Sequence, residues 1–356
     1  MSHPLNLAKV IKPQAGWYRG DFHAHTNFSD GHYPPPELVG VARAEGLDFF
    51  AITDHNTIDA YPHFGNPPDL LVIPGLEVTV KAGHFNVFGL EGQPDWLASA
   101  TWPNLDGPYN TMTGLMEQIA GEGLLNSINH PLLHPWEWRD GATDLRHVHC
   151  LEIWNDPSWP DNKQANPQAV DLWAAWLKAG YRLTAIGGSD YHRPDPAPNQ
   201  NKPPERLGLP STYVYAENLS GAAILAGLRR RQVYVSMGVQ VSFQAQANGR
   251  IYEIGADLGE LRGDLAFAAT VYNCPATAQA QIVKNDEIVA ETQVTEGKAS
   301  LDYAATIDPA QAAWYRLDVW GQDGQMLAIT NPIFAGPRRE PALRTYGDFV
   351  SYNEDE

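Results

Sequence analysis

The chain has 356 residues, of which 43% are hydrophobic and 19% charged, the balance of a globular protein long enough for one large domain and a smaller one. Its formal net charge of −18 at pH 7 opposes binding to nucleic-acid phosphates, which requires clusters of lysine and arginine. No stretch approaches the roughly 20 apolar residues of a membrane helix, and residues 1–13 lack the apolar core of a signal peptide, so we expect a cytoplasmic protein without membrane association.

Short apolar strands alternate with amphipathic helices from Trp17 to about Tyr234. The strands are predicted to end near His25, Asp54, Glu77, Gly89, His130, Asn155, Asp190 and Ala216. The helices are predicted from Pro36 to Glu45, Thr111 to Ala120, Pro167 to Ala179 and Leu219 to Arg231. Pro36 suits a first helical turn, and Gly46 and Gly180 suit the residues that follow helix ends. This alternation indicates an α/β fold with a parallel sheet.

Polar residues cluster where the predicted strands end. An open sheet gathers ligands only near its switch point, whereas a (β/α) barrel brings the carboxyl ends of all its strands to one mouth. About seven strands contribute such residues here. The pattern therefore favours a TIM-like barrel over an open sheet.

The pattern of apolar and polar residues changes after Met237. Short alternating or apolar runs are separated by turn signals such as Asn248-Gly249 and Asp323-Gly324, which is typical of an antiparallel sandwich. We predict a barrel over residues 15–238, a smaller all-β, sandwich-like domain over residues 239–336 and a polar tail over residues 337–356. The two cysteines, Cys150 and Cys274, lie far apart and are expected to be buried reduced thiols.

The segment from Asp21 to Gly31 reads Asp-Phe-His-Ala-His-Thr-Asn-Phe-Ser-Asp-Gly. Residues two apart on a strand point to the same face, so His23 and His25 can converge on one cation. A lone His-x-His pair is weak evidence. It gains weight from further histidines and acids near strand ends, and the full set of predicted metal ligands is His23, His25, Asp30, His55, Glu77, His84, His130, Asp190 and His192.

The order of these motifs resembles the PHP (polymerase and histidinol phosphatase) superfamily of metal-dependent hydrolases over roughly residues 15–240. The matching pieces are His23-Ala-His25-Thr, Ser29-Asp-Gly31, Thr53-Asp-His-Asn56, Gly75-Leu-Glu77, Asn129-His-Pro131 and Gly188-Ser-Asp-Tyr-His192. A softer resemblance links the chain to the carbaryl-hydrolase-like branch, which often carries a C-terminal β domain. It rests on the segments 207–215, 231–238 and 329–333.

The resemblance implies a distorted (β/α)7 barrel with a trinuclear metal site. His23, His25, Glu77 and Asp190 would hold the first metal. Glu77, His84 and His130 would hold the second, with Glu77 bridging, and Asp30, His55 and His192 would hold the third. Two or three divalent ions are expected, and manganese, zinc and iron all remain open because His-plus-carboxylate sites accept several metals.

A water shared by two cations can supply hydroxide at neutral pH, and Asp190 or His192 could carry a proton to the leaving group. Asp54 is expected to orient a ligand imidazole. Arg193, Arg206 and Lys81, together with Lys202, are candidates to bind a substrate anion. For each of these four cations, an ordinary solvated charge is the more common explanation.

Three functions fit these patterns. The favoured one is a phosphoesterase that acts on a small-molecule phosphate ester. The second is a carboxyl or carbamate ester hydrolase of the carbaryl-hydrolase type, and the third is a non-catalytic, metal-stabilised binding module. Trp136, Trp138, Trp154 and Trp159 lie in or beside loops that should flank the mouth, where they either pack structurally or form an aromatic wall for an apolar substrate group. The sequence leaves the oligomeric state open.

Overall fold

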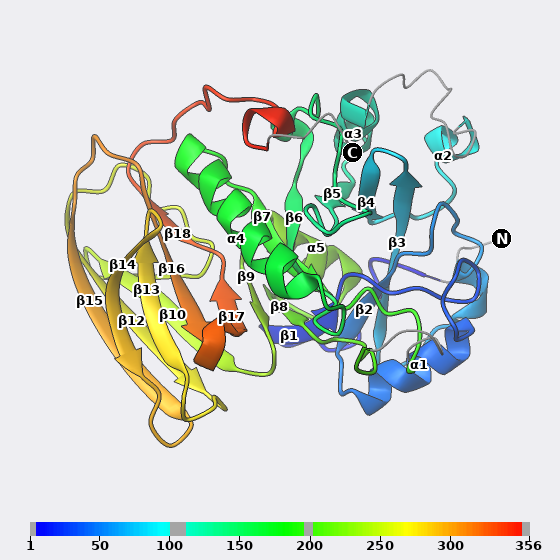
Figure 1. The fold of residues 1–356 in the computed structure, drawn as a ribbon, viewed down its shortest axis with the longest axis horizontal. Helices are drawn as coiled ribbons and strands as arrows, with labels where there is room; N and C mark the ends of the chain where they lie inside the picture. The colour runs from blue at the N-terminus through cyan, green and yellow to red at the C-terminus, as the bar shows by residue number, and fades with distance from the viewer. Residues whose placement is uncertain (1–4, 100–111, 196–201, 351–356) are drawn as a thin grey trace.

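A computed structural model describes residues 5–99, 112–195 and 202–350 of the chain. Figure 1 shows an α/β part next to an all-β part, and helix α4 of the α/β part lies on the side of the all-β part. The strands of the α/β part are β1 (Gly16–Asp21), β2 (Phe49–Ile52), β3 (Leu71–Val80), β4 (Gly83–Phe88), β5 (Leu125–Ile128), β6 (Cys150–Asn155), β7 (Thr184–Gly188), β8 (Ser211–Ala216) and β9 (Val233–Ser236). Its helices are α1 (Pro35–Ala44), α2 (Asp95–Ser99), α3 (Met112–Gly121), α4 (Asn162–Ala179) and α5 (Gly221–Arg229).

The helices lie close to their predicted positions, with one shifted start. Gly46 follows α1 with φ of 69°, a conformation that suits glycine. Helix α4 begins at Asn162 rather than at Pro167, because the Asn166 amide donates to the backbone oxygen of Asn155 at 2.7 Å and ties the first turns to the end of β6. Thr111, the predicted start of another helix, lies outside the described residues.

The larger sheet is mixed rather than parallel. Among the described residues it has 14 strands in the order β14-β13-β16-β17-β9-β8-β1-β2-β3-β4-β5-β6-β7, with β18 paired to β16. The runs β1-β2-β3 and β5-β6-β7 are parallel as predicted, but β4 is antiparallel to both of its neighbours and β8 is antiparallel to β1. Pairing with β4 also extends β3 to Val80, so Glu77 lies inside a strand and not at its end.

At one point of the predicted barrel, side-chain contacts take the place of backbone pairing between strands. Within the described part of the chain, no backbone ladder joins β7 to β8 or β9. Instead, the Thr212 hydroxyl accepts from Gly187 N at 2.8 Å and donates to Gly187 O at 2.7 Å. The Asn331 side chain bonds both backbone groups of Ala185 and also donates to Val233 O at 3.1 Å. These two side chains bridge the gap between the ends of the α/β sheet.

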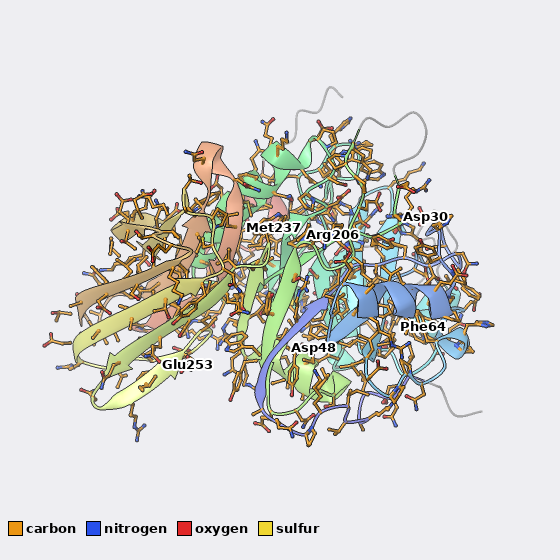
Figure 2. All side chains as sticks on the ribbon, turned by 90° about the horizontal axis from the view of Figure 1, so that it is seen from below. Asp30, Asp48, Phe64, Arg206, Met237 and Glu253 are labelled. Atoms are coloured by element: carbon orange, nitrogen blue, oxygen red, sulfur yellow. The ribbon has the colours of Figure 1, made fainter. Side chains whose placement is uncertain are left out.

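The all-β part contains two layers. Its strands are β10 (Gln240–Ala247), β11 (Arg250–Glu253), β12 (Gly263–Tyr272), β13 (Gln279–Lys284), β14 (Glu287–Gln293), β15 (Lys298–Ile307), β16 (Ala313–Trp320), β17 (Met326–Thr330) and β18 (Ile333–Ala335). A second sheet, β11-β10-β12-β15, packs on the end of the larger sheet through rings such as Phe267 and Tyr315, 4.4 Å apart. Because β9 pairs with β17, the larger sheet runs unbroken from one part into the other. Met237 lies at this junction (Figure 2) and its N–H donates to Leu327 O at 2.9 Å.

The described part of the predicted tail, residues 337–350, returns to the α/β part. It contains η4 (Tyr346–Asp348), and Tyr346 is fully buried between the rings of Trp138 and Trp176. This large apolar contact anchors a segment whose composition is mostly polar, and residues 351–356 lie outside the description. Both cysteines are buried and unpaired. Among the described helices, none is long and apolar enough to cross a membrane.

Candidate metal centre

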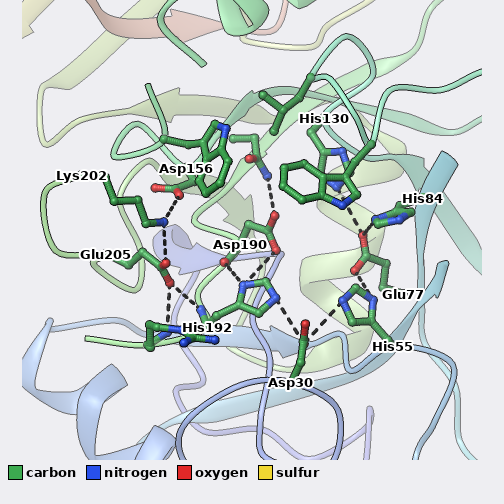
Figure 3. Close-up of a pocket in the computed structure, with 15 residues that line it drawn as sticks. Asp30, His55, Glu77, His84, His130, Asp156, Asp190, His192, Lys202 and Glu205 are labelled. Atoms are coloured by element: carbon green, nitrogen blue, oxygen red, sulfur yellow. Dashed lines mark hydrogen bonds and ion pairs between the residues drawn. The ribbon is translucent and has the colours of Figure 1, made fainter. Parts of the chain in front are cut away.

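Seven of the nine predicted ligands line one cavity of about 300 Å³, although they come from distant parts of the chain (Figure 3). The other two, His23 and His25, contact Glu77 and Asp190 of this lining. His23, His25 and Asp30 follow β1, and His55 follows β2. Glu77 lies within β3, and His84 lies in β4. His130 follows β5, and Asp190 and His192 follow β7. The fold therefore brings together every residue of the predicted ligand set, while the assignment of each to a particular ion stays a prediction.

His23 is fully buried and lies between three carboxylates. Its Nε2 lies 3.1 Å from Asp190 Oδ1 and 3.3 Å from Glu77 Oε1, and its Nδ1 lies 3.0 Å from Glu152 Oε1. Burial opposes the charged form of the ring, but the three carboxylates raise its pKa well above the ordinary value. The surroundings of this imidazole favour positive charge, supplied either by a proton or by a cation.

Glu77 is the carboxylate on which the histidines converge. Its oxygens lie 2.9 to 3.6 Å from the ring nitrogens of His23, His25, His55, His84 and His130. Asn129 Nδ2 donates to Glu77 Oε1 at 2.7 Å. Burial alone would raise its pKa, but the neighbouring imidazoles hold the pKa well below the usual range. A buried carboxylate with two oxygens directed at different histidines is suited to bridge two cations.

Asp30 provides the carboxylate of a second cluster, nearer to solvent. Its Oδ1 lies 3.3 Å from His192 Nε2, 3.5 Å from His55 Nε2 and 3.9 Å from His25 Nδ1. The rings of His25 and His192 stack with centroids 4.2 Å apart. Burial and these two neighbouring histidines lower the pKa of His25 to about 3, so the ring is neutral at pH 7, the form that binds a metal.

Several buried polar atoms in this cluster have no hydrogen-bond partner. They are His23 Nε2, His25 Nδ1, Glu77 Oε2 and His130 Nδ1. Of these, His23 Nε2 and Glu77 Oε2 lie 3.1 and 2.9 Å from an ionic neighbour without the alignment of a hydrogen bond. An unpaired buried polar atom normally costs about 1–3 kcal/mol, so four together point to a ligand. The donor set of imidazoles and carboxylates is one that divalent transition metals accept, and these residues therefore fit the metals that the sequence predicts.

Three groups of residues have ligand atoms within 4.8 Å of one another. They are His25, Asp30, His55 and His192; His23, Glu77 and His130; and His23, His25 and Asp190. This grouping resembles the predicted division into three ions. It differs in joining His25 to the outer group and in pairing His23, rather than His84, with Glu77 and His130. His84 Nδ1 still lies 3.3 Å from Glu77 Oε1.

Two buried acids that the sequence analysis missed support the ligands. Glu152 accepts from His130 N at 2.8 Å as well as contacting the His23 ring, and Asp21 accepts from His23 N at 2.9 Å and Gly208 N at 2.6 Å. Burial raises the pKa of Asp21 to about 6. Glu152 could have been recognised from the sequence, because it is a single carboxylate between apolar residues of β6.

The described hydrogen bonds of Asp54 do not include one to an imidazole, which was its predicted partner. It accepts instead from Thr26 N at 2.7 Å, from the Thr26 hydroxyl at 2.6 Å and from the Ser29 hydroxyl at 2.7 Å. These bonds shape the loop that carries His25 and Asp30. The carboxylate thus positions two ligands through the backbone and not through a ring nitrogen.

The predicted anion-binding residues divide into two pairs. Arg193 and Lys202 line the cavity, whereas Lys81 and Arg206 do not. Arg206 forms an exposed ion pair with Glu45 at 2.7 Å, and Lys81 lies in the exposed turn after β3. Lys202 is nearly buried, and its ammonium lies 2.7 Å from Glu205 and 3.2 Å from Asp156. Of the four, only Arg193 both lines the cavity and lacks a described ion pair with a carboxylate.

Comparison with known proteins agrees with this geometry. A family model described as "PHP domain" matches residues 21–120. A "Probable phosphatase" from Shewanella sediminis (strain HAW-EB3) is 31% identical over 198 residues, which covers 49% of this chain and 78% of that protein. A "Probable phosphatase" from Shewanella frigidimarina (strain NCIMB 400) is 31% identical over 196 residues, covering 48% and 77%.

A solved structure from Bacteroides vulgatus ATCC 8482 covers 93% of this chain and 99% of its own. It is described as "a two-domain protein containing predicted PHP-like metal-dependent phosphoesterase", with 17% identity and a TM-score of 0.46. That structural likeness is loose, and family membership rests on the sequence relatives and the matching motifs. The chain belongs to the PHP family.

Proposed function

We propose that this protein is a metal-dependent phosphoesterase that hydrolyses a small-molecule phosphate ester. The observation that carries the proposal is the convergence of nine predicted ligands on one cavity. Four buried polar atoms of these ligands lack a hydrogen-bond partner. The phosphatase descriptions of the Shewanella relatives support the choice of phosphate ester. A cavity of about 300 Å³ suits a small substrate.

Two or three divalent ions, manganese, zinc or iron, would be held by the residue groups around Glu77 and Asp30. When bound, such ions make water acidic enough to provide hydroxide at neutral pH and neutralise charge that develops on phosphoryl oxygens. Asp190, with Oδ1 3.1 Å from both His23 Nε2 and His25 Nε2, holds the two imidazoles together. Arg193 lines the cavity and would bind a phosphate oxygen.

His192 is the better candidate of the two proposed proton donors in a site with two metals, where it is not itself bound to an ion. Its Nδ1 donates to Asp190 O at 2.7 Å, which directs Nε2 toward the cavity side of Asp30. Burial opposes its charged form, but Asp30 and Asp190 raise its pKa to about 9, whereas histidines hold the pKa of Asp190 well below the usual range. Before metal is added, His192 therefore carries a proton at pH 7 and Asp190 does not.

The test is a substrate panel on the full chain reconstituted with Mn, Zn or Fe. We expect turnover of p-nitrophenyl phosphate or bis-p-nitrophenyl phosphate, no turnover by His25→Ala, and at least one equivalent of bound metal. Equal activity of His25→Ala and the unaltered protein would place the activity elsewhere.

The carboxyl or carbamate ester hydrolase is the second candidate, and the aromatic residues that line the cavity favour it. Turnover of 1-naphthyl acetate or a 1-naphthyl carbamate, with no phosphatase activity, would reverse the order of the two. Two results would support the third candidate, a non-catalytic module. One is a metal content well under one equivalent after growth with metal, and the other is a metal-loaded protein that is inactive on every substrate of the panel.

A further inference from the structure

One wall of the cavity has an apolar surface that phosphate hydrolysis does not require. It is formed by Leu133 and Trp136, from the loop after β5, and by Trp159, from the loop after β6; we call these three residues the aromatic wall. Trp136 is 38% exposed, and its ring meets that of Trp159 edge to face with centroids 5.4 Å apart. Ligand cavities are commonly lined by aromatic side chains that bind the apolar part of a ligand beside a few polar groups.

The aromatic wall is held in place before any substrate arrives. The ammonium of Lys202 lies 5.0 Å from the centre of the Trp159 ring and pairs with the carboxylates of Glu205 and Asp156. Trp136 N donates to Leu133 O at 2.8 Å, which closes the turn that carries the exposed ring. A preformed aromatic surface binds a ring with little ordering cost.

The charges beside the aromatic wall do not favour a second anion. The described lysine and arginine side chains that line the cavity are Lys202 and Arg193, and the carboxylates of Asp156 and Glu205 both pair with Lys202. Glu205 further accepts from the backbone N–H groups of His192 at 2.8 Å and Arg193 at 3.0 Å. Lys202 is therefore already paired with two carboxylates, and Arg193 remains for a single phosphate group.

We propose that the substrate is a phosphate ester whose alcohol part is an uncharged aromatic ring, bound against Trp136. This inference rests on the proposed phosphoesterase function and adds the class of leaving group. In the reaction, water forms a new O–P bond, the P–O bond to the aryl oxygen breaks, and the aryl oxygen takes up a proton. The aromatic wall contributes by holding the ring while the phosphate faces the metal ligands.

The experiment measures binding of phenylphosphonate and methylphosphonate to the metal-loaded full chain by calorimetry. Neither C–P bond is hydrolysed under these conditions, so leaving-group reactivity does not enter the comparison. We expect phenylphosphonate to bind about tenfold more tightly, the scale of one stacked aromatic group. Trp136→Ala should remove this preference and leave methylphosphonate binding unchanged, while Trp136→Phe should retain most of it.

Tyr272→Ala is the matched control, because Tyr272 is a similarly exposed aromatic, 41%, on the distant strand β12. It should bind both phosphonates like the unaltered protein. Equal affinity for the two phosphonates, or an equal loss of both in Trp136→Ala, would overturn the inference. Phosphatase activity without a phenyl preference removes this inference alone, whereas a phenyl preference without any phosphatase activity removes the proposed function.

Discussion

The two sides of the cavity differ in how their charged groups are satisfied. On the metal side, His23, His25, Glu77 and His130 each leave a buried ring or carboxylate atom without a hydrogen-bond partner. On the opposite side, the ammonium of Lys202 lies between two carboxylates, and Trp159 stacks near it. The first side leaves several potential metal-binding atoms without a hydrogen-bond partner, whereas on the second side the described charged groups are paired and Trp159 Nε1 is the unpaired buried atom. The structure thus separates a surface built to take up cations from a surface built to shape the substrate.

Removal of metal should produce the largest effect. Exhaustive chelation is expected to reduce hydrolysis at least about 10³-fold and lower Tm by about 10 °C, because ligand-linked stabilisation reaches ~4 kcal/mol at saturating metal. Activity assays, metal analysis and thermal unfolding measure the change, and re-addition of metal is the control. Full activity at less than a tenth of an equivalent of metal would contradict the assignment of the metal side.

Glu152→Gln tests the support behind the metal ligands. The amide keeps the size of the side chain but removes the charge that orients His23, so metal affinity should fall about 10- to 100-fold. Metal titration followed by activity and calorimetry gives the affinity. Glu253→Gln, at an exposed position of β11, should bind metal normally. Unchanged affinity in Glu152→Gln would mean that the carboxylate only fills space.

Lys202→Met tests whether the charges on the opposite side are balanced among themselves. The substitution leaves Asp156 and Glu205 in a buried setting without their cation, which should cost about 3 kcal/mol in the free energy of unfolding. Metal binding should be unchanged, because Lys202 lies outside the ligand groups. Denaturant unfolding and metal titration separate the two effects. A loss of metal affinity without a loss of stability would show that the two sides are not independent.

The pH dependence of stability should distinguish metal-free from metal-loaded protein. Burial opposes charging of His55 and His192, but neighbouring carboxylates raise their pKa values to about 10 and about 9. Stability from these raised values is fully present below the unfolded pKa near 6.5 and is lost as pH rises through 9 to 10. Thermal scans should therefore show the metal-free Tm falling by about 5 °C between pH 7 and 10, with a flatter profile for the loaded protein. Parallel profiles would contradict this account.

Arg206→Ala should have the smallest effect. Its ion pair with Glu45 is exposed, and such pairs contribute about 0–1 kcal/mol. Because Arg206 lies outside the cavity lining, kcat/KM should stay within about twofold of the unaltered value. Arg193→Ala provides the contrast, with KM expected to rise about tenfold or more. Equal losses of kcat/KM in the two variants would indicate that Arg206 contributes to substrate binding.

The sequence alone predicted most of the metal side. The His-x-His spacing predicted that His23 and His25 lie together, although β1 ends at Asp21 and not near His25, so both histidines follow the strand. The ordered motifs around Glu77, His130 and Asp190 identified the family before any coordinates. These inferences depend on local geometry, because alternation along a strand decides which side chains share a face. The α/β alternation and the change to short β strands after Met237 followed from the same local patterns.

Only the tertiary structure decided which groups are partners. Glu152 contacts His23 across 129 residues of chain, Lys202 pairs with Asp156 across 46, and the buried Tyr346 donates to Pro131 O across 215. The reversal of β4, the side-chain bridge by Asn331 and the surface pairing of Arg206 also depend on contacts between distant segments. Local sequence sets the face on which a side chain emerges, but burial and charge pairing depend on what the rest of the fold brings beside it.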